Sequence, residues 1–154
     1  PPRQPDLIQR HLMSLHHNVY ASPDYLKDHG MPRTPEDLDN HKIVTFGDQV
    51  GDQTELLPSL NFLIEAGRGT KGPRQPVLKV NNVYGIYRAV LSGVGVGALP
   101  NYFFEGSSSL VRILPELHSP ETEIYFVYPE ELRQSARIAV FRDFLVRKIH
   151  ESRK

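Results

Sequence analysis

The chain of 154 residues, 39% of them hydrophobic and 23% charged, has the composition of an ordinary globular domain, which excludes disorder as a global description. Its 18 basic and 18 acidic side chains leave no net charge, so the basic surplus by which nucleic-acid-binding modules usually neutralise phosphates is missing. The chain has no cysteine, which excludes disulfides, thiol nucleophiles and cysteine metal sites, and no segment approaches the ~20 apolar residues of a membrane helix.

The first part of the chain predicts a strand followed by two capped helices. Residues 1–10 are polar and proline-rich, lack the apolar centre of a signal peptide and are interpreted as a surface connector of an internal fragment. A strand is expected within residues 12–20. Ser22-Pro23-Asp24 and Thr34-Pro35-Glu36 each have the pattern of a helix start, and Gly30 predicts the end of the first helix.

The middle of the chain alternates between strand and loop patterns. Ile43–Phe46 is a short β-rich run that predicts a strand ending at Gly47. A further strand is expected at residues 60–64. The glycines and prolines of residues 67–76 predict a loop.

The clearest unit of the sequence is a strand at 77–80, a helix at 82–92 and a strand at 94–99. The helix is predicted from apolar residues at helical spacing, namely Val83, Ile86, Tyr87 and Val90. Toward the end of the chain, residues 102–104 suggest a short helix or turn. The apolar run 124–128 predicts a strand buried on both faces, and a helix is expected over 135–150 with an apolar stripe of Ile138, Phe141, Leu145 and Ile149. This alternation predicts an α/β fold with a mainly parallel sheet.

The helix predicted over 82–92 begins where the strand 77–80 ends. This edge of an α/β sheet is where ligands bind, and the unpaired N–H groups of a helix start favour an anion. Asn81 and Asn82 therefore have two interpretations. As helix caps they need no further function, and as ligand-orienting amides they would donate and accept hydrogen bonds beside the helix start.

Three other motifs favour structural explanations. The segment Gly93–Gly97 follows a predicted helix and opens a strand, the reverse of a dinucleotide-binding loop. His16 and His17 have no third ligand at the spacing of a metal site, and Tyr102-Phe103-Phe104 lacks the basic neighbours of a base-stacking platform. Because no serine elbow or metal set is recognisable, we expect neither an enzyme nor a bound metal or cofactor.

Three segments, in this order, resemble the effector-sensing domain of LysR-type transcriptional regulators. HNVYASPDYLKDHGMPRTPEDLDNHKIVTFG is similar to the passage from the first lobe of that sensor to the second. LKVNNVYGIYRAVLSGVGVGALPNYFFE resembles the core of the second lobe, and EIYFVYPEELRQSARIAVFRDFLVRKI resembles the return strand and closing helix. The sequence motifs NNVYG and FVYPEELR resemble those of an alphaproteobacterial, LsrB-like branch of the family.

The resemblance implies a two-lobed, periplasmic-binding-protein-like (type II) fold in which the opening part of lobe one is missing. Residues 1–17 would be a remnant of lobe one, 18–128 would form lobe two with the hinge strands, and 129–154 would be the return segment and closing helix of lobe one. The family's winged helix-turn-helix is not recognisable in the chain. Contact with DNA is therefore expected only through an absent N-terminal domain.

By position, the resemblance places the lining of the effector cleft on eight residues: Thr45, Phe46, Gly47, Lys79, Asn81, Asn82, Gly95 and Val96. It agrees with the helix-start argument for the two asparagines. The implied function is binding of a small anionic effector between the lobes, which shifts the population of conformations of a homo-oligomeric, cytoplasmic regulator with no membrane partner. The alternative is the solute-binding protein of a transporter, which shares the fold but would need a secretion signal. The basic closing helix and the LysR-like sequence motifs disfavour a transporter component.

Overall fold

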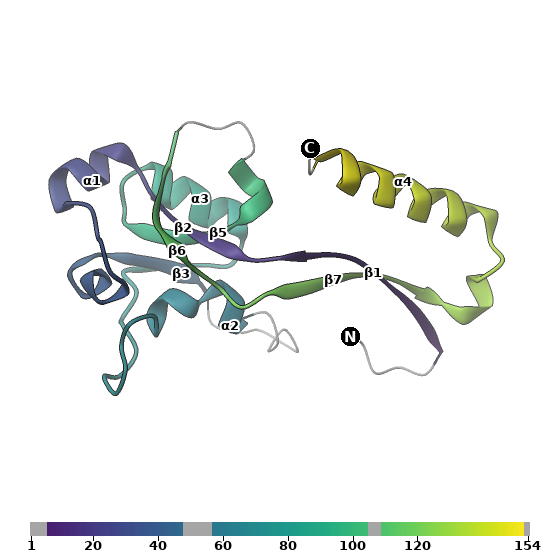
Figure 1. Cartoon of the computed structure of the whole chain (residues 1–154), viewed down its shortest axis with the longest axis horizontal. Helices are drawn as coiled ribbons and strands as arrows, with labels where there is room; N and C mark the ends of the chain where they lie inside the picture. Colours follow the sequence, from purple (N-terminus) through teal and green to yellow (C-terminus); the bar gives the residue numbers. More distant parts are fainter. Residues whose placement is uncertain (1–5, 48–56, 105–108, 153–154) are drawn as a thin grey trace. The chain divides into compact units, whose positions relative to one another are not determined.

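The structure is a computed structural model that describes residues 6–47, 57–104 and 109–152 (Figure 1). The internal contacts of the chain divide it into two compact units. Unit 1 comprises Pro1–Leu15 and Thr122–Lys154, and unit 2 comprises His16–Glu121. Each unit is described by itself.

Unit 1 contains an antiparallel pair of strands, β1 (Leu7–Leu15) and β7 (Thr122–Pro129), followed by the short η4 (Glu130–Leu132) and the long α4 (Ala136–Ser152). Residues 7–10 therefore belong to a strand, and the expectation of a connector is wrong for them. The backbone pairing with β7 orders these residues although their side chains show no regular apolar alternation.

The prediction that residues 124–128 are buried on both faces is also wrong. Most of their side chains are half-buried, and within the described residues β7 belongs to a sheet of two strands, β1 and β7. The helix predicted over 135–150 is confirmed by α4. Ile138, Leu145 and Ile149 of its apolar stripe are half-buried, whereas Phe141 remains 52% exposed.

Within the described residues, unit 2 is built on a five-stranded sheet in which β4, β3, β5, β2 and β6 follow one another. These strands are β2 (His17–Ala21), β3 (Ile43–Phe46), β4 (Leu78–Val80), β5 (Val96–Pro100) and β6 (Val111–His118). Strand β3 is parallel to both β4 and β5, but β2 is antiparallel to both β5 and β6. The sheet is therefore mixed, and the expectation of a mainly parallel sheet is wrong. Since β2 does not join β5 through a strand–helix–strand crossover, no connection forces it to be parallel.

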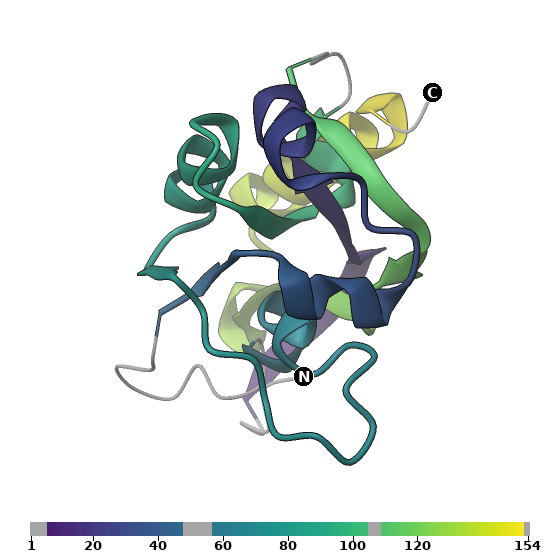
Figure 2. The same ribbon diagram turned by 90° about the vertical axis from the view of Figure 1, so that its left-hand side faces the viewer.

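Helices cover both faces of this sheet. On one face, α1 (Pro23–His29), η1 (Pro35–Asn40) and η2 (Phe62–Ile64) surround a core that includes Val19, Ile43 and Val96. In Figure 2, α1 and η1 face the viewer in front of the strands. On the other face, α3 (Val83–Leu91) packs Ile86 and Val90 against the strands. Gly97 allows this close packing, because a Cβ atom there would lie 2.6 Å from Val90.

The predicted helix starts are confirmed by their caps. Ser22 Oγ accepts a hydrogen bond from Tyr25 N at 3.2 Å, and Gly30 ends α1 with a φ of 84°. In η1 the carboxylate of Asp37 accepts from Thr34 N at 3.0 Å and from Arg33 N at 2.8 Å. The short helix expected at 102–104 is also present, as η3 (Asn101–Phe104).

Two parts of unit 2 differ from the prediction. Residues 57–64 form α2 (Leu57–Leu60) and η2 instead of a strand. The side chain of Asn61, which lies between these two helices, makes hydrogen bonds with the backbone N–H and carbonyl of Phe46, as a paired strand would. Strand β6 was not predicted. Its pairing with β2 is interrupted between Ile113 and His118, where Leu114 has a φ of 48° and Pro115 removes a backbone donor.

Candidate functional site

Five backbone segments of unit 2 meet at one edge of the sheet. The parallel strands β4, β3 and β5 have their carboxyl ends there, at Val80, Phe46 and Pro100. Because β2 runs in the opposite direction, its amino end lies at the same edge, where His17 pairs with Pro100. The carboxyl end of β6 joins them through the pairing of His118 with Asn18. In α/β sheets this carboxyl edge is the usual place of a ligand site.

The end of β3 is held by an asparagine that the sequence did not single out. Asn61 Oδ1 accepts a hydrogen bond from Phe46 N at 2.9 Å, and Asn61 Nδ2 donates to Phe46 O at 3.2 Å. The adjacent Gly47 N donates to Val80 O at 3.1 Å, which ties the end of β3 to the end of β4. The end of β3 is therefore held on two sides at the predicted site, by Asn61 and by the end of β4.

Asn81 and Asn82 differ in what their side chains do. The Asn82 side chain caps α3, since its Oδ1 accepts from Gly85 N at 2.6 Å. The Asn81 side chain instead lies over Gly47, and a Cβ atom at residue 47 would overlap its carboxamide oxygen. Both asparagines are exposed. Thus Asn82 accounts for a cap, and Asn81 presents an amide beside the start of the helix.

The remaining predicted residues separate into two groups. Thr45 and Lys79 pair across β3 and β4, so they lie with Phe46, Gly47, Asn81 and Asn82 near the carboxyl edge. Lys79 is exposed, whereas Thr45 is 2% exposed. Gly95 and Val96 lie at the amino end of β5, where Val96 pairs with Ile43 and its N–H donates to Lys42 O. The structure therefore does not bring Gly95 and Val96 together with the other six residues.

Three buried oxygen atoms of unit 2 have no hydrogen-bond partner among the described residues. They are Thr45 Oγ1, Asn18 Oδ1 and Asn101 Oδ1. All three belong to residues at or near the carboxyl edge, and Asn18 and Thr45 are 4% and 2% exposed. Because a buried polar atom without a partner is destabilising, such atoms are candidates for ligand contact.

A cluster of one histidine and two serines lies at the same edge, at the start of β2. His17 Nδ1 lies 3.2 Å from Ser59 Oγ of α2 and 3.3 Å from Ser119 Oγ, and the two hydroxyls are 3.0 Å apart. His17 N also donates to Ser119 Oγ at 2.9 Å. Burial, with a smaller effect of the neighbouring His16, lowers the pKa of His17 to about 4. His17 is therefore neutral at pH 7, and no sequence motif marked this cluster because its members are 42 and 102 residues apart.

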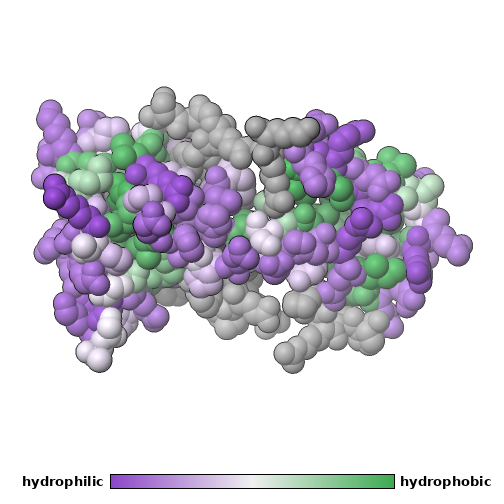
Figure 3. Space-filling view, in the orientation of Figure 1, coloured by the Kyte–Doolittle hydropathy of each residue, from purple (hydrophilic) through white to green (hydrophobic). Residues whose placement is uncertain are grey.

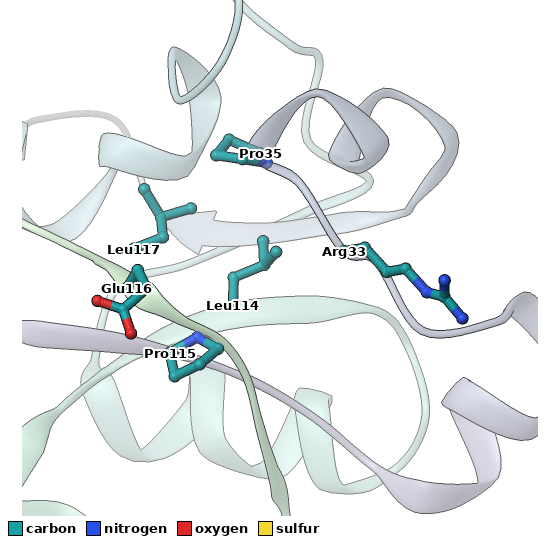
Figure 4. A pocket seen from close by; sticks show the side chains of 6 residues that line it. All are labelled: Arg33, Pro35, Leu114, Pro115, Glu116 and Leu117. Atoms are coloured by element: carbon teal, nitrogen blue, oxygen red, sulfur yellow. The ribbon is translucent and has the colours of Figure 1, made fainter.

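A separate small cavity of about 180 Å³ lies beside the interruption of β6 (Figure 4). Its lining residues are Arg33, Pro35, Leu114, Pro115, Glu116 and Leu117. None of them is a predicted site residue. Figure 4 shows Arg33 and Glu116 on opposite sides of Leu114, so the charged groups border an apolar floor.

Metal sites and membrane-spanning helices are both absent from the described residues. No group of three or more histidine, aspartate or glutamate side chains has the arrangement of a metal site among them. No helix in the described part of the chain is both long and apolar enough to cross a membrane.

Residues 1–149 match the family model of the LysR substrate binding domain. The HTH-type transcriptional regulator CrgA of Neisseria meningitidis serogroup C is 28% identical over 147 residues, which are 93% of this chain and 47% of that protein. An uncharacterized HTH-type regulator of Escherichia coli, YhjC, is 27% identical over 129 residues, covering 81% of this chain and 42% of its own. The chain thus spans about half the length of these curated relatives.

Solved structures show the same fold. The CrgA regulatory domain from Neisseria meningitidis, a LysR-type transcriptional regulator, matches 97% of this chain and 72% of its own with a TM-score of 0.75 and 25% identity. Full-length AphB, a virulence activator of Vibrio cholerae, matches 95% of this chain and 49% of its own with a TM-score of 0.66. Because only 21% of the aligned residues are identical, this likeness shows a shared fold and nothing about function.

Proposed function

Because the chain belongs to the LysR substrate-binding domain family, we propose that it senses a small anionic effector for a DNA-binding transcriptional regulator. The proposed site in this chain is the carboxyl edge of the five-stranded sheet of unit 2. In this proposal unit 1 corresponds to the family's lobe one and unit 2 to its lobe two. The effector shifts the population of conformations of the regulator by binding one of them more tightly.

The functions of the whole regulator are part of the same proposal. Contact with DNA falls to a segment outside this chain, as in relatives described as helix-turn-helix regulators. Assembly into homo-oligomers and action in the cytoplasm follow from the expected role in transcription. The LsrB-like branch stays a prediction. A transporter's solute-binding protein is the weaker alternative, since the relatives above are regulators.

The start of α3 is the feature that supports an anionic effector. The first N–H groups of a helix have no partner within the helix, and the positive end of its dipole favours an anion by ~0.3–1 kcal/mol at an exposed site. Asn82 uses one of these groups, Gly85 N, so the others remain available toward the edge where Asn81 and Gly47 lie. Lys79 adds a positive charge to the preceding strand.

The test compares two variants that both retain a helix cap. Asn82→Asp places a negative charge at the helix start, whereas Asn82→Ser is a neutral cap and serves as the control. We expect both to melt close to the parent. In a thermal-shift screen of anionic metabolites followed by calorimetric titration, Asn82→Asp should weaken binding of the hits about 5-fold or more, and Asn82→Ser should bind like the parent. Hits that are neutral or cationic, or anions that bind Asn82→Asp as well as the parent, would contradict the proposal.

A further inference from the structure

Two asparagines at the carboxyl edge combine burial with an unpaired oxygen. Asn18 lies in β2 and is 4% exposed, and its carboxamide oxygen is buried without a partner among the described residues. The same holds for the carboxamide oxygen of the half-buried Asn101, which directly follows β5. A carboxamide oxygen accepts hydrogen bonds and cannot donate them. What these two atoms lack is therefore a donor.

The backbone places the two asparagines close together. Asn18 pairs with Leu99, and Asn101 N donates to His16 O at 2.9 Å, which continues the pairing of β5 and β2 by one step. Asn18 and Asn101 are thus diagonal neighbours, which lie about 7–8 Å apart in antiparallel strands. Both are in unit 2, at the same edge as Gly47 and Asn81.

The order of strands sets their separation from Gly47, against which the Asn81 amide lies. Gly47 follows β3, β5 is the next strand in the sheet and β2 is the one after it. Neighbouring strands are about 4.8 Å apart, so the two oxygens lie roughly 5–10 Å from the end of β3 along the edge. A small molecule whose anionic group lies beside Gly47 and Asn81, just before α3, reaches them if it has a second polar group at that distance.

We propose that the effector carries a hydroxyl or ammonium group roughly 5–10 Å from its anionic group, and that the oxygens of Asn18 and Asn101 bind this donor. This inference rests on the proposed function, because it takes the anionic group to lie at the start of α3. It names the effector class as an extended hydroxy acid or amino acid. A second carboxylate in place of the donor would face two acceptors and is excluded.

The stability of the protein without ligand tests the state of the two oxygens. Asn18→Leu and Asn101→Leu replace each side chain by an apolar one of similar shape, which removes an unpaired acceptor. We expect each variant to raise the melting temperature by about 2–4 °C. Asn61→Leu is the matched control, because the Asn61 carboxamide is fully used by Phe46 N and O, and we expect its melting temperature to fall. If an ordered water satisfied Asn18, its leucine variant would melt lower than the parent, which would overturn the inference.

Binding is tested with four acids of similar length. The probes are heptanoate, 6-hydroxyhexanoate, 6-aminohexanoate and hexanedioate, which carry at the far end a methyl group, a hydroxyl, an ammonium and a second carboxylate. Calorimetric titration of the parent should show the hydroxy or amino acid binding about 5- to 10-fold more tightly than heptanoate, with hexanedioate weakest. In Asn18→Leu and Asn101→Leu this preference should disappear. Whichever of the two favoured probes binds more tightly identifies the donor as hydroxyl or ammonium.

The outcomes separate this inference from the proposed function. Equal binding of all four acids, weakened by Asn82→Asp, would overturn the donor assignment and leave the anion site intact. A preference for the hydroxy or amino acid that persists in both leucine variants would also overturn it. Binding that is unaffected by Asn82→Asp would overturn the proposed anion site instead, and binding of none of the probes would count against both.

Discussion

The carboxamide of Asn81 occupies the space in which a side chain at Gly47 would begin. This relationship joins the end of β3 to the residue before α3, two points of the chain that are 34 positions apart and that the sequence marked separately. Glycine at residue 47 therefore leaves room for the Asn81 amide, and no unusual backbone conformation calls for it.

Replacing Gly47 by alanine should displace the Asn81 amide and change ligand binding more than stability. Only the end of a flexible, exposed side chain has to move, so we expect a loss of less than about 1 kcal/mol in the free energy of unfolding. Affinity for an anionic ligand should fall more than 5-fold in calorimetric titration. In the double variant Gly47→Ala/Asn81→Ala, the two changes should be non-additive in stability, because the overlap is gone. Additive effects would mean that the two residues do not interact.

The stability of the protein should decrease as the pH falls from about 6.5 to about 4. The pKa of His17 is lowered from 6.5 to about 4, so in this interval the unfolded chain takes up a proton that the folded protein excludes. His41 acts in the same direction, since burial also lowers its pKa. The loss due to His17 should be on the order of 2 kcal/mol, measured by urea denaturation at a series of pH values.

The control for this pH dependence is His17→Gln, which does not titrate. The variant should be less stable than the parent at pH 7, because the bonds with Ser59 and Ser119 change. Its stability should then vary less between pH 6.5 and 4, with the remaining slope due to His41 and, toward pH 4, to Asp37 and Asp39, whose pKa values are also lowered. An unchanged slope would show that His17 is protonated as easily in the folded as in the unfolded state.

Arg74 should contribute more to stability than any exposed ion pair of unit 2. Its side chain is 5% exposed and donates to the carbonyl oxygens of Leu63, Ala66 and Pro35, at 2.9, 2.6 and 3.0 Å. It also pairs with Asp39 at 2.6 Å, and the pKa of Asp39 is lowered to about 2 by Arg68 first and by Arg74 and Lys71 in addition. We expect Arg74→Met to cost about 3–5 kcal/mol in chemical denaturation, because it leaves buried carbonyl groups without a donor.

The matched control is Arg68→Met on the same carboxylate. Arg68 is more exposed and bonds to Asp39 and to Gly72 O, so its loss should cost about 1 kcal/mol or less. Similar losses for the two variants would show that the pairing with Asp39, and not the carbonyl contacts, determines the effect of Arg74.

The exposed apolar residues of α4 in unit 1 should govern how readily the chain associates with itself. Val140, Phe141 and Phe144 are 71%, 52% and 43% exposed, and with Ala136 and Arg137 they border an apolar hollow. Hydrophobic residues reach the surface in this region of Figure 3. Val140→Glu should lower self-association in analytical ultracentrifugation and the binding of an apolar dye, while changing the free energy of unfolding by less than about 0.5 kcal/mol.

Val146→Glu is the control for this surface, because Val146 is a half-buried residue of the same helix. It should reduce stability rather than association. If Val140→Glu and the parent associate equally, the exposed face is not the surface through which copies meet.

Local signals were sufficient for the helix starts and the family of this chain. Ser22 and Asn82 cap their helices as predicted, because the cap oxygen and the backbone N–H that donates to it lie within four residues of each other in the sequence. The strands Ile43–Phe46 and Leu78–Val80 and the helix between Leu78–Val80 and β5 were also predicted, since their apolar patterns are continuous. The family assignment used the order of three such segments.

Only the tertiary structure decided which strands pair and which polar groups meet. The antiparallel position of β2, the strand formed by residues 7–10 and the interrupted β6 depend on partners that are up to about 120 residues away, as for Leu7 and Pro129. The family resemblance assigned Gly95 and Val96 to the same cleft lining as Gly47, although they lie at opposite ends of parallel strands. The sequence did not single out Asn18, Asn61 or Asn101, and it did not predict the serine partners of His17. A buried hydrogen bond or an unpaired oxygen is a property of the assembled sheet edge and leaves no periodic pattern in the chain.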